Sequence, residues 1–355
     1  METTLKDGRN YGIDALRLFS MFLVAVLHVL GHGGVLEAAG GPQSAIAWLM
    51  ETAAYCAVNC FALISGYVGY SKAEKPWRPA NYLRLWLGVF VYSFGITLLA
   101  RVLRPEQVAW NDVLKSMLPV TTKPYWYFTA YTGLFFVLPG LNALLRGASD
   151  RELNRTVAGL FGVLSVYGTL VASKADIFQL KNGYSFLWIA AVYVMGGWMR
   201  RNSESILRRV TTAGALAGIA ACVAVTWGCR LLLPSAPQIL LSYTSPTILL
   251  AAAGWTLVFS RLSFAGAARA FVRSLSPAAF GVYLIHVHPV CWRLIEGRFA
   301  WIAASPAWLL PLPVLGCALG VFAACLLIEK TRLILFGKAA SAMQAVRAKR
   351  RSAHS

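Results

Sequence analysis

Charged side chains are scarce in this chain, and acidic ones are the scarcest. Only 13% of its 355 residues are Asp, Glu, Lys or Arg, about half the share of an average soluble domain. Hydrophobic residues make up 58% of the chain, and its mean hydropathy is +0.60. This composition argues against a pair of soluble domains. It predicts an all-α membrane protein that crosses the bilayer several times.

Cysteine and histidine are also few, with seven and five residues. Cys56 and Cys60 share a helix face, but the other cysteines have no metal-ligand spacing. His28 and His32 lie one turn apart without a third ligand. Buried free thiols are the simpler interpretation, and we predict no disulfide, no metal site and no bound cofactor.

Long apolar runs are what the chain does have. The first run has no small-residue cleavage site, so we interpret it as a retained span. A spanning helix needs about 20 mostly apolar residues. That length predicts ten transmembrane helices, at about 12–31, 45–69, 82–103, 124–145, 156–173, 184–199, 210–233, 246–264, 276–295 and 307–328. We predict a membrane domain over 1–330 and a basic juxtamembrane tail over 331–355, attracted to anionic membrane lipid.

The basic residues predict how the spans are oriented. The formal net charge of +19 could indicate a nucleic-acid partner. However, 23 of the 33 basic residues fall in the amino-terminal segment, the carboxyl-terminal segment and alternate loops, and nine in the intervening loops. This bias predicts that both termini are cytoplasmic and makes nucleic acid an unneeded explanation. Trp77, Tyr82 and Trp86 at an inner boundary, with Tyr125, Trp126 and Tyr127 at an outer one, suit an interfacial aromatic belt.

Polar residues interrupt the first span, "IDALRLFSMFLVAVLH". Asp14, Arg17 and His28 share one helix face, and Arg17 and His28 are ~16 Å apart along it. A neutral imidazole can take a proton from a hydroxyl or accept an acyl group, while guanidinium binds phosphate. The plainer interpretation is a histidine bonded to a neighbouring helix and an arginine that reaches the interface. The shared face favours a site for a long ligand.

The second span adds Glu51, Ser65, Gly66 and Tyr67. Glu51 would enter at a depth similar to that of His28, so we predict that its carboxylate orients the imidazole; the alternative is a carboxylate that reaches water. Ser65 and Gly66 would allow close approach near the cytoplasmic end. The segment after this span contains Arg78 and Arg84, which belong to a basic patch able to bind a polyphosphate. The positive-inside bias also explains this charge.

A second intramembrane histidine, His286, falls about halfway through the ninth span, "SPAAFGVYLIHVHP". Two histidines at mid-depth favour a lined cavity over two unrelated packing residues. For an oxyanion stabiliser the chain offers Tyr127, Tyr283 and His286 as candidates.

Four segments in order resemble the integral-membrane acyltransferases of family 3. "IDALRLFSMFLVAVLH" resembles their Asp-x-Leu-Arg opening followed by His, and "CFALISGYVGY" their Ser-Gly-Tyr/Phe segment. "YWYFTAYTGLFFVLPGLNALL" resembles their Trp-Tyr segment, and "SFAGA...LSPAAFGVYLIHVHP" their Tyr-Leu-x-His segment. The resemblance spans 11–330. Phe280 stands where the family often has tyrosine, which weakens a hydroxyl role there.

The resemblance implies transfer of an acyl group from cytoplasmic acyl-coenzyme A to a hydroxyl of an extracytoplasmic glycan or lipid-linked sugar, in a multi-pass protein of the bacterial inner membrane. It implies His28 and Arg17 as the essential pair, with Ser65, Gly66 and Tyr67 and, later, Tyr283 and His286. We place Trp126 and Tyr127 of the third motif among the substrate-binding residues. Acetyl is the default acyl group.

Without a fused extracytoplasmic domain, acceptor delivery falls to this chain or to a partner, and a homo-oligomer is left open. We predict His28 as general base, with a covalent acyl-imidazole as the less favoured route. A transporter of a lipid-linked or anionic solute is the alternative, although no inverted repeat supports it. A sensing module without turnover is a further alternative.

Overall fold

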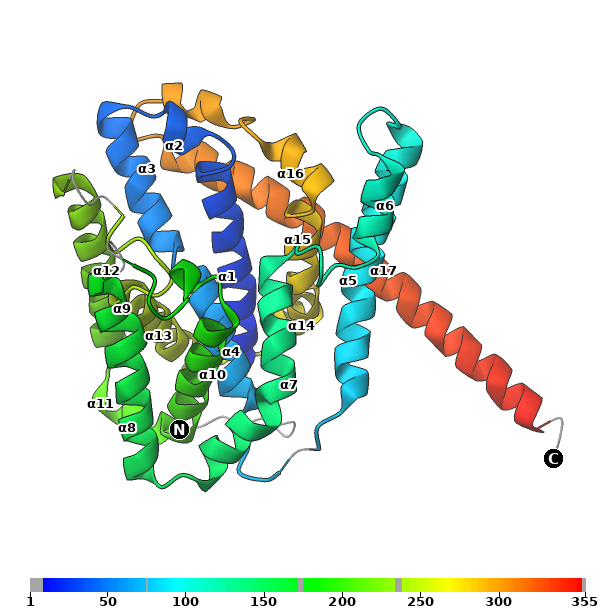
Figure 1. The fold of residues 1–355 in the computed structure, drawn as a ribbon, viewed down its shortest axis with the longest axis horizontal. Helices are drawn as coiled ribbons and strands as arrows, with labels where there is room; N and C mark the ends of the chain where they lie inside the picture. The colour runs from blue at the N-terminus through cyan, green and yellow to red at the C-terminus, as the bar shows by residue number, and fades with distance from the viewer. Residues whose placement is uncertain (1–8, 75, 172–174, 234–237, 353–355) are drawn as a thin grey trace.

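The computed structural model describes residues 9–74, 76–171, 175–233 and 238–352. This part of the chain is helical and contains no strand, as the composition predicts. In Figure 1 the helices form an elongated bundle, with α2 (Val35–Ala38), α6 (Trp110–Ser116) and α16 (Pro289–Ile295) at one end. The start of α1, at Tyr11, and α11 (Ser203–Arg209) lie at the opposite end. We refer to these as the α2 end and the N-terminal end.

Six helical segments of the described chain are long and apolar enough to cross a membrane. One of them is the pair α3 (Gly41–Ala54) and α4 (Ala57–Gly69), which together count as one span. The other five are α1 (Tyr11–Leu30), α5 (Pro79–Leu103), α7 (Trp126–Gly147), α12 (Thr212–Leu232) and the Pro311–Gly337 part of α17 (Pro311–Ser352). A bent pair, Gly266–His286 with Pro289–Ala304, makes a seventh if it is one span.

Three of the ten predicted spans coincide with helices that do not pass this test. The span predicted at 156–173 is divided among α8 (Asp150–Leu160), the π-helical η1 (Phe161–Tyr167) and α9 (Gly168–Val171). The other two are α10 (Phe186–Arg201), with 16 residues, and α13 (Pro246–Ser260), with 15. The count of ten and the cytoplasmic location of the termini therefore stay predictions.

The helix predicted at 276–295 is not continuous, because the chain bends by 78° at the break between His286 and Pro289. The bent pair consists of α14 (Gly266–Leu275), η3 (Ser276–Ala278) and α15 (Ala279–His286) before the break, and α16 and η4 (Ala300–Ala304) after it. Pro289 has no backbone N–H and begins the new helix, while His288 Nδ1 accepts from the Val290 N–H at 3.1 Å. The bend brings α16 back over the end of α1.

α17 continues through the start of the predicted tail at 331 and ends at Ser352, and the membrane-surface role of this tail stays a prediction. Residues 353–355 lie outside the described residues. In Figure 1 the carboxyl-terminal part of α17 projects away from the bundle.

The core of the bundle is held by close contact between α4 and α10. A Cβ added at Gly66 would lie 1.9 Å from the Tyr193 carbonyl oxygen, and one at Gly196 would lie 2.2 Å from that of Leu63. Small residues thus allow the two backbones to touch, as is usual where helices pack in membranes. Nearby, the fully buried Asn59 donates to the Tyr243 carbonyl and accepts from Trp188 Nε1.

Glu329 of α17 is a buried carboxylate with three donors. Arg332 donates to it from Nε and Nη2 at 2.6 and 2.7 Å, and the Tyr92 hydroxyl of α5 donates at 2.5 Å. Only a glycine fits at position 281, because a Cβ there would lie 2.3 Å from Glu329 Cγ. This network joins α5, α15 and α17.

Removing only the arginine should leave that carboxylate buried and unpaired. We expect Arg332→Leu to lower the free energy of unfolding by about 3–5 kcal/mol. The double variant Glu329→Leu with Arg332→Leu should recover much of the loss, because no charge stays buried. Thermal denaturation of the detergent-purified variants measures both. Equal melting temperatures for Arg332→Leu and wild type would contradict the prediction.

Candidate functional site

Two histidines from distant parts of the chain meet at the α2 end. His28, in the last turn of α1, places Nδ1 2.8 Å from Nε2 of His286, the last residue of α15. His286 is buried, with 1% of its surface exposed, and its Nδ1 lies 2.5 Å from the Val282 carbonyl oxygen. Both predicted histidines therefore belong to one site.

The hydrogen bonds of this pair fix the tautomers of two neutral imidazoles. A carbonyl oxygen can only accept, so His286 Nδ1 carries a proton and its Nε2 is an acceptor. His28 Nδ1 must then donate to that Nε2. The other nitrogen of His28, Nε2, is left unprotonated and able to take a proton.

Trp292 of α16 closes the site on another side. Its ring meets His28 edge-on, with centroids 4.6 Å apart, and stacks on His32 at 3.9 Å. His32 Nε2 also lies 2.9 Å from the Trp292 carbonyl oxygen. The sequence analysis missed Trp292, because only the bend at Pro289 brings it back to α1.

Beside Trp292 lies a cavity of about 640 Å³. It opens between α5, α6 and α16, and both charges and hydroxyl groups line it. The lining includes Thr97, Asp112, Lys115, Ser116, His288 and Arg293. Trp292 also lines this cavity and contacts the His28 ring, whereas neither His28 nor His286 lines it.

At the N-terminal end of α1, Asp14 is paired with two arginines. Arg17 Nη1 lies 3.0 Å from Asp14 Oδ1, and Arg9 Nε lies 2.5 Å from Oδ2. The side chain of Arg17 keeps 29% of its surface exposed. Asp14 thus holds Arg17 beside a second cation, and the predicted shared face of Asp14 and Arg17 is confirmed.

Between the two ends, two buried hydroxyls have no hydrogen-bond partner among the described residues. They belong to Ser20, between Arg17 and His28 in the sequence of α1, and to Tyr127 at the start of α7; the hydroxyls of Thr52 and Thr169 elsewhere are unpaired in the same way. The Tyr127 hydroxyl lies near Ser65 and within electrostatic range of Arg17. Its backbone N–H donates to the Tyr283 hydroxyl at 3.4 Å. Unpaired buried polar groups of this kind are costly and call for a partner.

The structure does not bring Glu51 to His28 as predicted. Glu51 is buried, its Oε2 has no hydrogen-bond partner among the described residues, and its charge acts on Tyr55 and Tyr243. His286 occupies the position expected for a carboxylate. The reason is tertiary: α15, rather than α3, presents its polar side chain to the end of α1.

The second-span residues divide between two surroundings. Ser65 lies near Tyr127, although its hydroxyl donates to the Phe61 carbonyl of its own helix at 2.9 Å. Gly66 contacts α10, and Tyr67 is buried with the Arg200 guanidinium over its ring. At Gly66 it is therefore the backbone of α10 that approaches closely.

The predicted aromatic belt at Trp126 and Tyr127 is replaced by interior packing. Tyr125 next to them is fully buried and donates to the Leu284 carbonyl at 3.0 Å. Trp126 packs against Tyr184, with ring centroids 4.5 Å apart. The reason is that Tyr125 and Phe128, on either side of Trp126 and Tyr127, are fully buried among the helices, which a linear pattern does not reveal.

Arg78 and Arg84 stand exposed at the start of α5, and their predicted phosphate role stays a prediction. Among the residues that the structure describes, no group of three or more His, Cys, Asp or Glu is placed to hold a metal ion.

Comparison with known proteins assigns the family. Residues 10–330, nearly the whole chain, match the acyltransferase domain family. No curated protein and no solved structure matches the chain at a significant level. With several helices long and apolar enough to cross a membrane, the chain belongs to this acyltransferase family and is a membrane acyltransferase.

Proposed function

We propose that this acyltransferase moves an acyl group, acetyl by default, from acyl-coenzyme A to a hydroxyl of a glycan or lipid-linked sugar. His28 is the general base. The observation that carries this assignment is the His28–His286 pair, which leaves His28 Nε2 unprotonated. In the transfer the acceptor hydroxyl gives its proton to Nε2 while its oxygen attacks the thioester carbonyl. The thiolate of coenzyme A then leaves and takes up that proton.

The donor fits along α1. With its phosphates at Arg17, an extended pantetheine arm covers the ~16 Å to His28. Ser20 lies between Arg17 and His28 along α1, and its unpaired hydroxyl and that of Tyr127 would gain hydrogen bonds from the amide groups of the arm. This supports a donor that enters at the N-terminal end, which the positive-inside bias places in the cytoplasm.

The acceptor reaches His28 from the α2 end. The cavity beside Trp292 has hydroxyl and charged groups that suit a sugar. This arrangement keeps donor and acceptor on opposite sides of the imidazole, in keeping with a bacterial inner-membrane protein that modifies an extracytoplasmic glycan.

Membranes from cells with and without the gene, supplied with radiolabelled acetyl-coenzyme A, test the function. Label should enter the glycan or lipid extract only when the protein is present, and alkali should release it as expected for an ester. No label from acetyl-coenzyme A or longer acyl donors, with the protein verified as expressed, would contradict the proposal.

His286 acts as a positioning residue, because it holds His28 in one tautomer. We expect His286→Leu to lower kcat by about 10²-fold, a share of the 10²–10⁴-fold contribution typical of general-base catalysis. KM for the donor should change little. His286→Gln, whose amide oxygen accepts a hydrogen bond, should recover part of the loss. Equal kcat values for His286→Leu and wild type would contradict the role, as would a loss confined to KM.

A further inference from the structure

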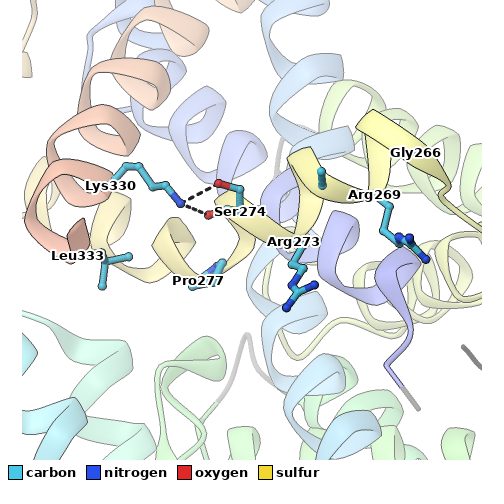
Figure 2. Close-up of a pocket in the computed structure, with 8 residues that line it drawn as sticks. Gly266, Arg269, Arg273, Ser274, Pro277, Lys330 and Leu333 are labelled. Carbon is cyan, nitrogen blue, oxygen red and sulfur yellow. Dashed lines mark hydrogen bonds between the residues drawn. The ribbon is translucent and has the colours of Figure 1, made fainter. Parts of the chain in front are cut away.

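A basic groove of about 440 Å³ lies between α14 and α17, away from the histidine pair. Arg269, Arg273 and Lys330 line it, and no acidic residue does. Figure 2 shows the two arginines on α14 and Lys330 reaching across from α17. Three cations thus face one concave surface without a lining carboxylate to balance them.

The groove is held in shape by Lys330. Its ammonium donates to both the carbonyl oxygen and the hydroxyl of Ser274, each at 2.7 Å (Figure 2). Glu329, the sequence neighbour of Lys330, is engaged by Arg332, and Asp14, which pairs with Arg9 and Arg17, does not line the groove. The positive charge of the groove therefore stays available to an external anion.

Apolar residues also line the groove, namely Ala270, Pro277 and Leu333. In a membrane protein such side chains contact acyl chains. Basic residues next to apolar ones suit an anionic phospholipid, whose phosphate would contact the basic residues and whose acyl chains would contact the apolar ones.

The groove also adjoins the Arg17 cluster. Arg9, which is paired with Asp14, donates to the Ser276 hydroxyl at 3.3 Å, and Ser276 follows the groove residues of α14 in sequence. The groove therefore belongs to the N-terminal end of α1, where the leaflet is cytoplasmic if the positive-inside bias holds.

We propose that this groove binds the phosphate group of an anionic ligand. The apolar lining residues favour a phospholipid of the surrounding leaflet, and the nucleotide phosphates of acyl-coenzyme A carry the same chemistry. The inference goes beyond the proposed acyl transfer and does not depend on it, because binding requires only the charges and shape of the groove. A chain that failed to transfer acyl groups would still bind.

The test uses the full-length protein in neutral detergent and native mass spectrometry. The probes are phosphatidylglycerol, phosphatidylcholine and coenzyme A, each added alone. The triple variant Arg269→Gln, Arg273→Gln, Lys330→Gln is compared with wild type. Arg208→Gln with Arg209→Gln serves as the control, because these exposed arginines of α11 lie at the same end of the bundle. Thermal denaturation verifies that each variant is folded.

We expect the triple variant to weaken binding of the phosphate ligand by at least about tenfold, since each basic residue near a membrane surface contributes about 1 kcal/mol. The control should bind like wild type. Loss confined to phosphatidylglycerol identifies a lipid site, and loss confined to coenzyme A identifies a nucleotide site. Unchanged binding of both would overturn the proposal, as would an equal loss in the control.

Discussion

His28→Ala should lower acyl transfer by at least about 10²-fold, the largest effect we expect on activity. The substitution removes the nitrogen that takes the acceptor proton, and general-base catalysis typically contributes 10²–10⁴-fold. It also leaves His286 Nε2 without the donor at 2.8 Å. The rate of label transfer from acetyl-coenzyme A in purified membranes, at equal protein levels, measures the loss.

His32→Ala is the matched control for this loss. It removes an imidazole one turn further along α1, whose ring stacks on Trp292, and should retain most of the activity. Equal losses in His28→Ala and His32→Ala would contradict the base role. So would trapping of labelled acyl on His28 without acceptor, because that result assigns the covalent route.

Gly66→Ala should cause the largest loss of stability among small substitutions at the predicted site residues. The new Cβ would lie 1.9 Å from the Tyr193 carbonyl oxygen and 2.8 Å from the Gly197 nitrogen. Both atoms belong to the backbone of α10, so the helices must separate. Overpacking typically costs about 1–3 kcal/mol, and contact with a backbone falls at the upper end. The melting temperature of the detergent-purified protein measures the effect.

Gly88→Ala is the matched control, because a Cβ there meets nothing within 4 Å. Alanine favours helix over glycine by about 1 kcal/mol, so this variant should be at least as stable as wild type. If Gly66→Ala kept the wild-type melting temperature and instead raised KM for the donor, Gly66 would be a ligand contact, as the sequence predicted.

Much of the fold was accessible from the sequence, because spans depend on local composition. Apolar runs predicted α1, α5, α7, α12 and the start of α17, and they placed breaks near the loops observed. The 78° bend before Pro289 was not accessible, because it falls inside an apolar run, and neither was the π-helical segment η1 within the continuous helix over 150–171.

The candidate site was likewise predictable from the sequence only in part. The helical repeat alone placed Asp14, Arg17 and His28 on one face of α1, because residues of one helix are related by a fixed rotation. Which residue faces His28 was decided only by tertiary structure. Glu51 was the reasonable candidate by depth, yet the packing of α15 against α1 supplied His286 instead.

The sequence by itself therefore determined that the chain is a helical membrane protein and which family it resembles. It also determined that polar residues lie along one face of the first helix. Composition, periodicity and motif order depend only on the order of residues along the chain. The tautomer of His28, the position of Trp292, the helix contact at Gly66 and the basic groove between α14 and α17 were decided by the fold. Each depends on atoms from helices far apart in sequence, and their contact follows from how the helices pack.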